Sequence, residues 1–240
     1  LAERLDVRLH THLAEDPDED TYCLETYGVR PLEHFEDCGW GSDRAWVAHC
    51  IYPDEAEVAR LGRWGTGVAH CPSSNMRLGS GIAPIRAMLD AGVKVGLAVD
   101  GSASNDSGHM LAEARQALLL QRVQLGASAI SAEEVLALGT RGGAAVLGRD
   151  DIGVLSPGMA ADLIGVRTDR LAAAGAQADP LAALLFCAPP QVDLSVINGR
   201  IVVEKGQLLG VDLPALVARH NELAQELLDR ARRRGYEPDG

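Results

Sequence analysis

The first hundred residues repeat one pattern: a short apolar, β-prone run ends in a polar residue and is followed by a stretch of helical character. Four such runs occur, at 7–12, 45–49, 66–70 and 94–100. Near-continuous apolar runs bounded by turns are typical of buried parallel strands. Units of roughly 20–40 residues suit the βα repeats of a (β/α)8 barrel. Because only four units are visible, the sequence predicts half of such a barrel.

The remaining segments predict the helices and a second domain. Helices are expected at 53–64, 82–91, 110–125 and 131–147. The last of these should begin with a capping box between Ser131 and Glu134. After Gly148 the pattern changes to short strands at 152–166, broken by a Ser-Pro-Gly turn, and to a hairpin at 192–209 that turns at Asn198-Gly199.

The predicted fold class is therefore α/β, the C-terminal half of a (β/α)8 TIM-type barrel with part of a small β-sandwich domain and a C-terminal helix. The expected division is 1–150 for the barrel strands five to eight with their helices, 151–212 for the sandwich segment and a connecting helix, and 213–240 for the closing helix. The stretch 1–5 has the character of the tail of a helix, so we expect that an N-terminal portion precedes this sequence.

Charge and composition exclude several partners. The net charge is −12, which repels nucleic acid phosphates and anionic lipid, so neither nucleic acid nor a membrane is an expected partner. No apolar run has the length of a transmembrane span. The five cysteines are odd in number and form no CxxC pair, which favours reduced thiols in a cytoplasmic protein.

Each predicted strand ends at a residue able to bind a metal or transfer a proton. The four residues are His12, His49, His70 and Asp100. Barrel strands end at the catalytic face, so we expect these side chains to converge there. A single histidine at a strand end is more often a hydrogen-bonded structural residue than a ligand. Four such residues at recurring positions favour the functional interpretation.

Three residues around the first strand are distinguished by their spacing. His10 and His12 lie two apart and so face the same side of a strand. His12 lies nearer the loop and is the better candidate for a metal ligand, with His10 packing behind it. Glu15 comes just past the strand, where the chain can turn its carboxylate over a metal. The alternative is that Glu15 is a solvated acid in an acidic loop.

Two polar loops complete the candidate site. Asp100 precedes the small-residue loop 101–106 and could bind a divalent metal and accept a proton from its water. His70 opens the polar loop 71–79, which suits ligand recognition. Cys50 and Cys71 each follow a candidate histidine and are interpreted as packing residues.

Three other kinds of site are excluded by motifs that the sequence lacks. It contains no GxSxG elbow of a serine hydrolase and no Walker loop, and it does not have the HxE with PCxxC signature of the cytidine deaminase fold.

At these motifs the sequence resembles the amidohydrolase superfamily, in its cytosine deaminase and chlorohydrolase-like branch. The motifs are His12-x-x-Glu15, Ala48-His49, His70-Cys71-Pro72-Ser73-Ser74-Asn75, Val99-Asp100-Gly101-Ser102, and the sandwich segments at 156–163 and 196–200. The order matches the family's barrel strands five to eight. Within the branch, the stretches 10–16, 71–78, 100–106 and 180–185 look most like 8-oxoguanine deaminases.

The resemblance implies a zinc enzyme of purine metabolism that hydrolyses 8-oxoguanine to urate and ammonia. His12 and Asp100 would bind one divalent metal, zinc or alternatively iron. Asp100 and His49 would orient and deprotonate water, and Glu15 would protonate the purine ring. The implied substrate-binding residues are Glu15, His70, Ser73 and Asn75. An alternative is another deaminase or chlorohydrolase of the branch, acting on guanine, adenosine-type compounds or triazines.

The sequence departs from the family pattern at one place. The family has a His-x-His pair on its first barrel strand, and both members bind the metal. Here the pair His10-x-His12 is followed by Leu-Ala-Glu, which places it on strand five. We therefore expect this chain to hold half of the metal shell and to be inactive alone, with an inactive remnant as a further alternative. An exposed barrel edge would favour a homo-oligomer.

Overall fold

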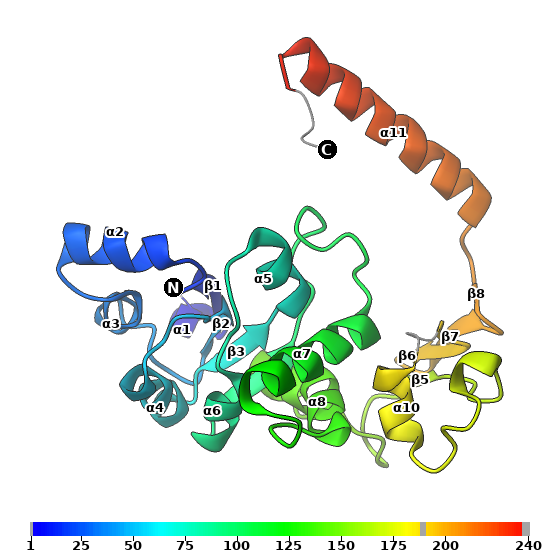
Figure 1. The fold of residues 1–240 in the computed structure, drawn as a ribbon, viewed down its shortest axis with the longest axis horizontal. Coiled ribbons are helices and arrows are strands. Elements are labelled where there is room, and N and C mark those ends of the chain that lie inside the picture. The colour runs from blue at the N-terminus through cyan, green and yellow to red at the C-terminus, as the bar shows by residue number, and fades with distance from the viewer. Residues whose placement is uncertain (1, 188–190, 237–240) are drawn as a thin grey trace. The chain divides into compact units, whose positions relative to one another are not determined.

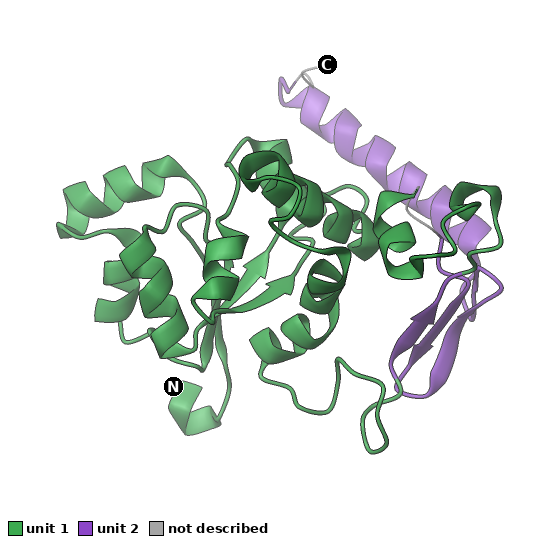
Figure 2. Ribbon diagram, turned by 60° about the horizontal axis from the view of Figure 1, so that its bottom comes forward, with its two compact units in different colours: residues 1–161, 167–190 green, residues 162–166, 191–240 purple. Residues whose placement is uncertain are grey.

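The computed structural model describes residues 2–187 and 191–236 (Figure 1). The chain folds into two compact units, Leu1–Ala161 with Arg167–Pro190, and Asp162–Val166 with Gln191–Gly240 (Figure 2). The division into three segments at residues 150 and 212 stays a prediction. The suggested helical tail is present in part as α1, Ala2–Leu5, while Leu1 lies outside the described residues.

A parallel sheet forms the centre of the first unit. Its strands are β1 Leu9–Leu13, β2 Ala45–His49, β3 Gly67–His70 and β4 Lys94–Leu97. They pair in chain order, β1-β2-β3-β4, and every pairing is parallel. The four predicted strands and their parallel arrangement are confirmed. Asp100 lies three residues past the end of β4, so this strand is shorter than the sequence pattern indicated.

Helices alternate with these strands. They are α2 Pro17–Tyr27, α3 Pro31–Asp37, α4 Glu55–Trp64, α5 Pro72–Leu78, α6 Ile85–Asp90, α7 Met110–Leu125, α8 Ala132–Ala137, α9 Gly143–Leu147 and α10 Pro180–Phe186. The predicted helices at α4, α6 and α7 are confirmed. The helix α5 corrects the loop expected at 71–79. A proline at the first position of a helix lacks only an N–H that would be unpaired anyway, so Pro72 begins this helix at little cost.

The helix predicted at 131–147 is interrupted. Its capping box is present, since Glu134 N–H donates to Ser131 Oγ at 3.1 Å and Ser131 N–H donates to Glu134 Oε2 at 2.8 Å. Between α8 and α9 the chain makes a π-helical turn, Leu138–Gly142. A Cβ on Gly142 would lie 2.2 Å from the carbonyl oxygen of Val95, so glycine is required where this turn approaches β4.

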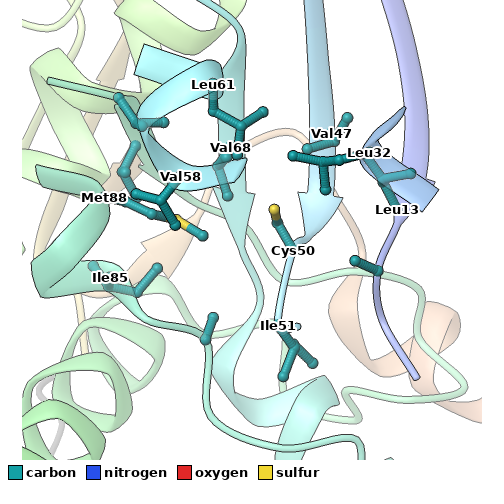
Figure 3. Packing of buried hydrophobic residues seen from close by; sticks show 14 of the residues in the cluster. Leu13, Leu32, Val47, Cys50, Ile51, Val58, Leu61, Val68, Ile85 and Met88 are labelled. Carbon is teal, nitrogen blue, oxygen red and sulfur yellow. The ribbon is translucent and has the colours of Figure 1, made fainter. Parts of the chain in front are cut away.

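The main hydrophobic core covers one face of the sheet. Leu61 of α4 and Met88 of α6 are fully buried against Val68 of β3 (Figure 3). On β1, Leu13 belongs to the same core, while His10 and His12 lie on the exposed side of the strand. This alternation confirms that the two histidines share a face. The core thus fixes the sheet from one side and leaves the strand ends to carry polar groups.

The second unit is an antiparallel sheet followed by a long helix. Its strands are β5 Leu163–Gly165, β6 Leu194–Ile197, β7 Arg200–Glu204 and β8 Gln207–Leu208. The hairpin between β6 and β7 is confirmed, with positive φ at Asn198 (47°) and Gly199 (76°). Of the strands expected at 152–166, β5 is the one that forms, because β6 supplies it with backbone partners.

The closing helix is confirmed as α11, Leu213–Arg233. Its apolar side chains, such as Leu216 and Leu227, are exposed within this chain. Among the helices of residues 2–187 and 191–236, none combines the length and the apolar character that crossing a membrane requires.

Candidate active site

Left-handed backbone marks the ends of three strands. Ala14 after β1 has φ of 51°, His49 at the end of β2 has 68°, and Asp100 beyond β4 has 61°. Residues other than glycine rarely adopt such angles, which cost about 1–3 kcal/mol each and concentrate at functional sites. At His49 and Asp100 the bend therefore helps to set where the side chain points.

Three of the predicted residues meet above the ends of these strands. His12, His49 and Asp100 each bring one potential ligand atom to within 4.8 Å of the others. His12 Nε2 lies 3.6 Å from Asp100 Oδ1, and the rings of His12 and His49 stack with their centroids 5.1 Å apart. Neighbouring donor atoms on a tetrahedral zinc ion, with bonds of roughly 2.0–2.2 Å, lie about 3.4 Å apart. The residues present therefore fit a divalent metal.

The two oxygens of Asp100 have different surroundings. Oδ2 accepts hydrogen bonds from Ser74 Oγ at 2.6 Å and from Ser104 Oγ at 2.7 Å. Oδ1 faces His12. Partial burial acts to raise the pKa of Asp100, but the two hydroxyl bonds, together with a backbone bond from Gly101 and the neighbouring His49, outweigh it and hold the pKa at about 2. Asp100 is therefore ionised at neutral pH, with one oxygen committed to the serines and the other directed at the candidate metal position.

His49 is fully buried at the centre of the cluster. Its Nδ1 lies 2.8 Å from Oδ1 of Asn75, so the imidazole N–H donates to the amide oxygen there. This tautomer leaves a lone pair on Nε2. Nε2 lies 3.5 Å from Glu15 Oε2 and has no hydrogen-bond partner among the described residues. A buried, unpaired nitrogen directed at a carboxylate and at two metal-ligand candidates suits a proton acceptor.

Glu15 completes the group. It follows the kink at Ala14, and its carboxylate lies beside His49. Burial raises the pKa of Glu15 above its usual value; His49 acts to lower it, while Asp16 and Asp100 raise it further. A raised pKa is the direction that suits a carboxyl which must both take up and release a proton. The side chain of Glu15 is 17% exposed and lies against His49, so it is not the freely solvated acid of the acidic-loop alternative.

His70 lies at the end of β3 and is fully buried. Burial and the neighbouring His49 lower the pKa of His70 to about 3, so its ring is neutral at physiological pH. Both ring nitrogens lack a hydrogen-bond partner in the described part of the chain. The substrate contact expected of His70 stays a prediction.

The helix α5 supplies the remaining candidates. Asn75 is fully buried, and its Oδ1 contacts Nδ1 of His49. Ser73 is partly buried, and its backbone N–H donates to Glu113 Oε2 at 3.1 Å. Glu113 is itself fully buried on α7, and its other oxygen accepts from Asn105 Nδ2 at 2.8 Å. Glu113 thus ties α5 to the loop after β4, the two segments that also carry the serines on Asp100.

His10 and the two cysteines behave as packing residues. His10 stacks on Trp46 with ring centroids 3.5 Å apart, and its Nδ1 lies 3.2 Å from the Trp46 carbonyl oxygen. Cys50 and Cys71 are buried, and burial raises the pKa of both thiols, to about 12 for Cys71. Neither thiol is ionised at neutral pH, as a metal-binding thiolate would have to be.

Sequence reasoning missed several residues that support this group. Ser74 and Ser104 lie within the two loops that were singled out, but nothing in their spacing marked the contact with Asp100. Glu113 gave no signal, because an acid on a helix is usually solvated. Glu19 accepts from the backbone N–H groups of Ala14 and Glu15, but in the sequence it is one of several acids between residues 15 and 20, a pattern that indicates a solvated loop.

Comparison with known proteins adds to this geometry. Residues 1–202 match the model described as the amidohydrolase family. The chain is 50% identical over 228 residues to the 8-oxoguanine deaminase of Pseudomonas aeruginosa, covering 95% of this chain and 51% of that protein. It spans about half the length of the curated relatives it matches.

Two zinc-containing solved structures are similar in fold. The atrazine chlorohydrolase from Arthrobacter aurescens TC1, complexed with zinc, matches with a TM-score of 0.88 at 39% identity, over 92% of this chain and 49% of that one. An adenosine deaminase from Xanthomonas campestris with bound zinc matches with a TM-score of 0.89 at 34% identity, over 96% and 52% of the two chains. The chain belongs to the amidohydrolase family.

Proposed function

We propose that the protein carrying this chain is a zinc-dependent deaminase that hydrolyses 8-oxoguanine to urate and ammonia. The observation that carries the proposal is the convergence of His12, His49 and Asp100 to within 4.8 Å, with Glu15 beside them. The 50% identity to an 8-oxoguanine deaminase supports the substrate. A chlorohydrolase is the alternative function, and the 39% identity to the atrazine chlorohydrolase is the observation that supports it.

In this proposal each residue has a separate task. His12 and Asp100 hold the zinc ion, which supplies the Lewis acidity that makes water nucleophilic near neutral pH. His49 accepts a proton from the attacking water at Nε2, the nitrogen that Asn75 leaves unprotonated. Glu15 protonates a ring nitrogen of the purine from Oε2, and its carboxylate then takes the second proton of the added water from the new hydroxyl group and delivers it to the departing amine. The proton held by His49 passes to Glu15 and restores both residues. The carbon–nitrogen bond breaks, ammonia leaves, and a carbonyl replaces the amine.

The proposal also covers the recognition of substrate and the fold around the site. Glu15, His70, Ser73 and Asn75 are the proposed substrate-binding residues.

The parallel sheet of the first unit is proposed as barrel strands five to eight, and the antiparallel sheet of the second unit as part of a β-sandwich. The five free cysteines favour a reducing cytoplasm. The strand β1 lies at an edge of the four-stranded sheet, and this edge would pair with further strands, supplied by the same protein or by a second copy in a homo-oligomer.

A substrate panel tests the function. The zinc-loaded natural protein that contains this chain is assayed with 8-oxoguanine, guanine, adenosine, an aminotriazine and a chlorotriazine, and ammonia and chloride are measured separately. The proposal predicts ammonia from 8-oxoguanine with kcat/KM about tenfold or more above the other compounds, a margin of about 1.4 kcal/mol. Chloride as the preferred product would favour the chlorohydrolase. No turnover of 8-oxoguanine by zinc-loaded protein would overturn the proposal.

A further inference from the structure

Ala14 is held in an unfavourable backbone conformation immediately before Glu15. Its φ is 51°, and the residue is buried. An alanine in this region lacks the freedom of glycine, so its surroundings must impose the turn. The direction in which Glu15 leaves the strand depends on this turn, because the two residues share a peptide group.

One side of the turn is fixed by the neighbouring strand. The carbonyl oxygen of Leu13 accepts from Cys50 N–H at 3.1 Å. The carbonyl oxygen of Ala14 accepts from Ile51 N–H at 2.8 Å and from Tyr52 N–H at 3.3 Å. These bonds attach the turn to the segment that follows His49, but they involve only its carbonyl groups.

Glu19 fixes the N–H groups of the same turn. Its Oε2 accepts from Ala14 N–H and its Oε1 from Glu15 N–H, both at 2.7 Å. Bonds to a carboxylate are stronger than bonds between neutral groups, so this pair clamps two successive peptides. Glu19 is the third residue of α2, where an acidic side chain commonly folds back onto the residue that precedes the helix.

The contact does not serve the start of α2 in the usual way. Asp16 precedes the helix and its side chain makes no capping bond, while Pro17 at the first helical position has no N–H to satisfy. Both oxygens of Glu19 are instead committed to peptides one and two residues further back. The carboxylate is thus placed on the turn at Ala14 and Glu15.

We propose that Glu19 is a positioning residue for Glu15: it holds the left-handed turn that directs the Glu15 carboxylate toward Nε2 of His49. The inference rests on the proposed function, in which Glu15 transfers protons. Glu19 acts through Glu15 and is not among the candidate metal ligands or the proposed substrate-binding residues. Loss of the clamp therefore lowers the rate of proton transfer without removing a binding contact.

A double-mutant cycle tests this in the zinc-loaded natural protein. Glu19→Gln keeps the shape of the side chain but turns an NH2 group toward one of the two N–H donors. We expect kcat for ammonia release to fall about 10- to 100-fold, with KM changed by about threefold at most. In a Glu15→Gln background the same substitution should lower kcat by about twofold or less, because the carboxylate that Glu19 positions is already absent. Glu25→Gln, an exposed residue of the same helix with the same change of charge, is the control and should keep native kcat.

Two measurements other than activity accompany the cycle. Amide hydrogen exchange at Ala14 and Glu15 should be faster in Glu19→Gln than in Glu25→Gln, while zinc content stays native. An equal loss of kcat in both backgrounds, unchanged kcat in Glu19→Gln, or unchanged amide exchange would overturn this inference alone. Native turnover by Glu15→Gln would overturn the proton-transfer role of Glu15 and this inference with it, whereas failure of the proposed function would show as no turnover of 8-oxoguanine by the zinc-loaded native protein.

Discussion

Oδ1 of Asn75 lies 2.8 Å from Nδ1 of His49, and both residues are completely buried. The contact joins the helix after β3 to the end of β2, and it determines which nitrogen of His49 carries the proton. A residue of α5 thus sets the tautomer of a side chain on the neighbouring strand, and Nε2 keeps the lone pair that the proposed proton transfer from water requires.

Replacing Asn75 by alanine should impair the reaction more than binding. Asn75→Ala leaves the buried Nδ1–H of His49 without an acceptor, so the correct tautomer is no longer favoured. We expect kcat to fall about 10- to 100-fold with native zinc content and KM within about threefold. Steady-state kinetics and metal analysis check this, with exposed Asn221→Ala as the control. A raised KM at native kcat would leave Asn75 only the substrate contact proposed for it and would contradict its effect on the tautomer of His49.

The metal site can be tested through His12. This side chain is 55% exposed and takes no part in the buried core, so its removal should leave folding intact. His12→Ala deletes a donor atom 3.6 Å from Asp100 Oδ1, and we expect both zinc content and ammonia release to be lost. Elemental analysis after dialysis measures the zinc content, and His220→Ala, which removes an exposed histidine outside the site, is the control. Native zinc content in His12→Ala would remove it from the ligand set.

Much of the first unit could be predicted because its signals are local. The strands around Val47 and Val68 are apolar on both faces, which is the pattern of a buried parallel sheet, and the capping box at Ser131 marks a helix start. The helix α5 was missed because Pro72 and the following serines are typical of loops when the chain is taken alone. Packing of Ser74 and Asn75 beneath the strand ends overrides that preference.

The site itself could be predicted only in part. Strand-end positions identify His12, His49 and Asp100, because the geometry of a parallel sheet brings such positions together. The contacts of Ser74 and Ser104 with Asp100 depend on how two loops fold onto each other, and no local pattern encodes that. Glu113 and Glu19 are acids on helices, and only the fold reveals that Glu19 accepts from two backbone N–H groups and Glu113 from one backbone N–H and the side chain of Asn105.

Stability should fall in acid because of His70. Burial lowers the pKa of His70 from 6.5 to about 3, so the unfolded chain binds a proton in this window that the folded chain does not. The stability that neutral His70 supports is complete above about pH 6.5 and decreases as the pH falls toward about 3, by at most about 1.4 kcal/mol per pH unit. Urea unfolding at several pH values measures how the free energy of unfolding changes with pH. This change per pH unit should be smaller in His70→Gln and equal to that of the native protein in His220→Gln. An unchanged slope in His70→Gln would show that another group controls the acid response.

Core packing should dominate the stability of the first unit. Leu61 of α4 is completely buried in the main core, whereas Val123 of α7 is 78% exposed. Leu61→Ala should lower the free energy of unfolding by about 2–5 kcal/mol. Val123→Ala should change it by about 0.5 kcal/mol or less. Denaturant unfolding of the two variants measures the difference, and similar values for both would contradict the assigned core.

Glu15, beside His49 and the candidate metal ligands, is the residue that we propose to transfer the proton in a zinc-dependent deamination. The most direct test of this role is the rate of ammonia release from 8-oxoguanine by Glu15→Gln, measured at the same zinc content as the native enzyme. Proton transfer by a positioned side chain contributes about 10²–10⁴-fold to rate, so kcat should fall by about that factor with zinc retained. Native kcat in zinc-loaded Glu15→Gln would contradict the account.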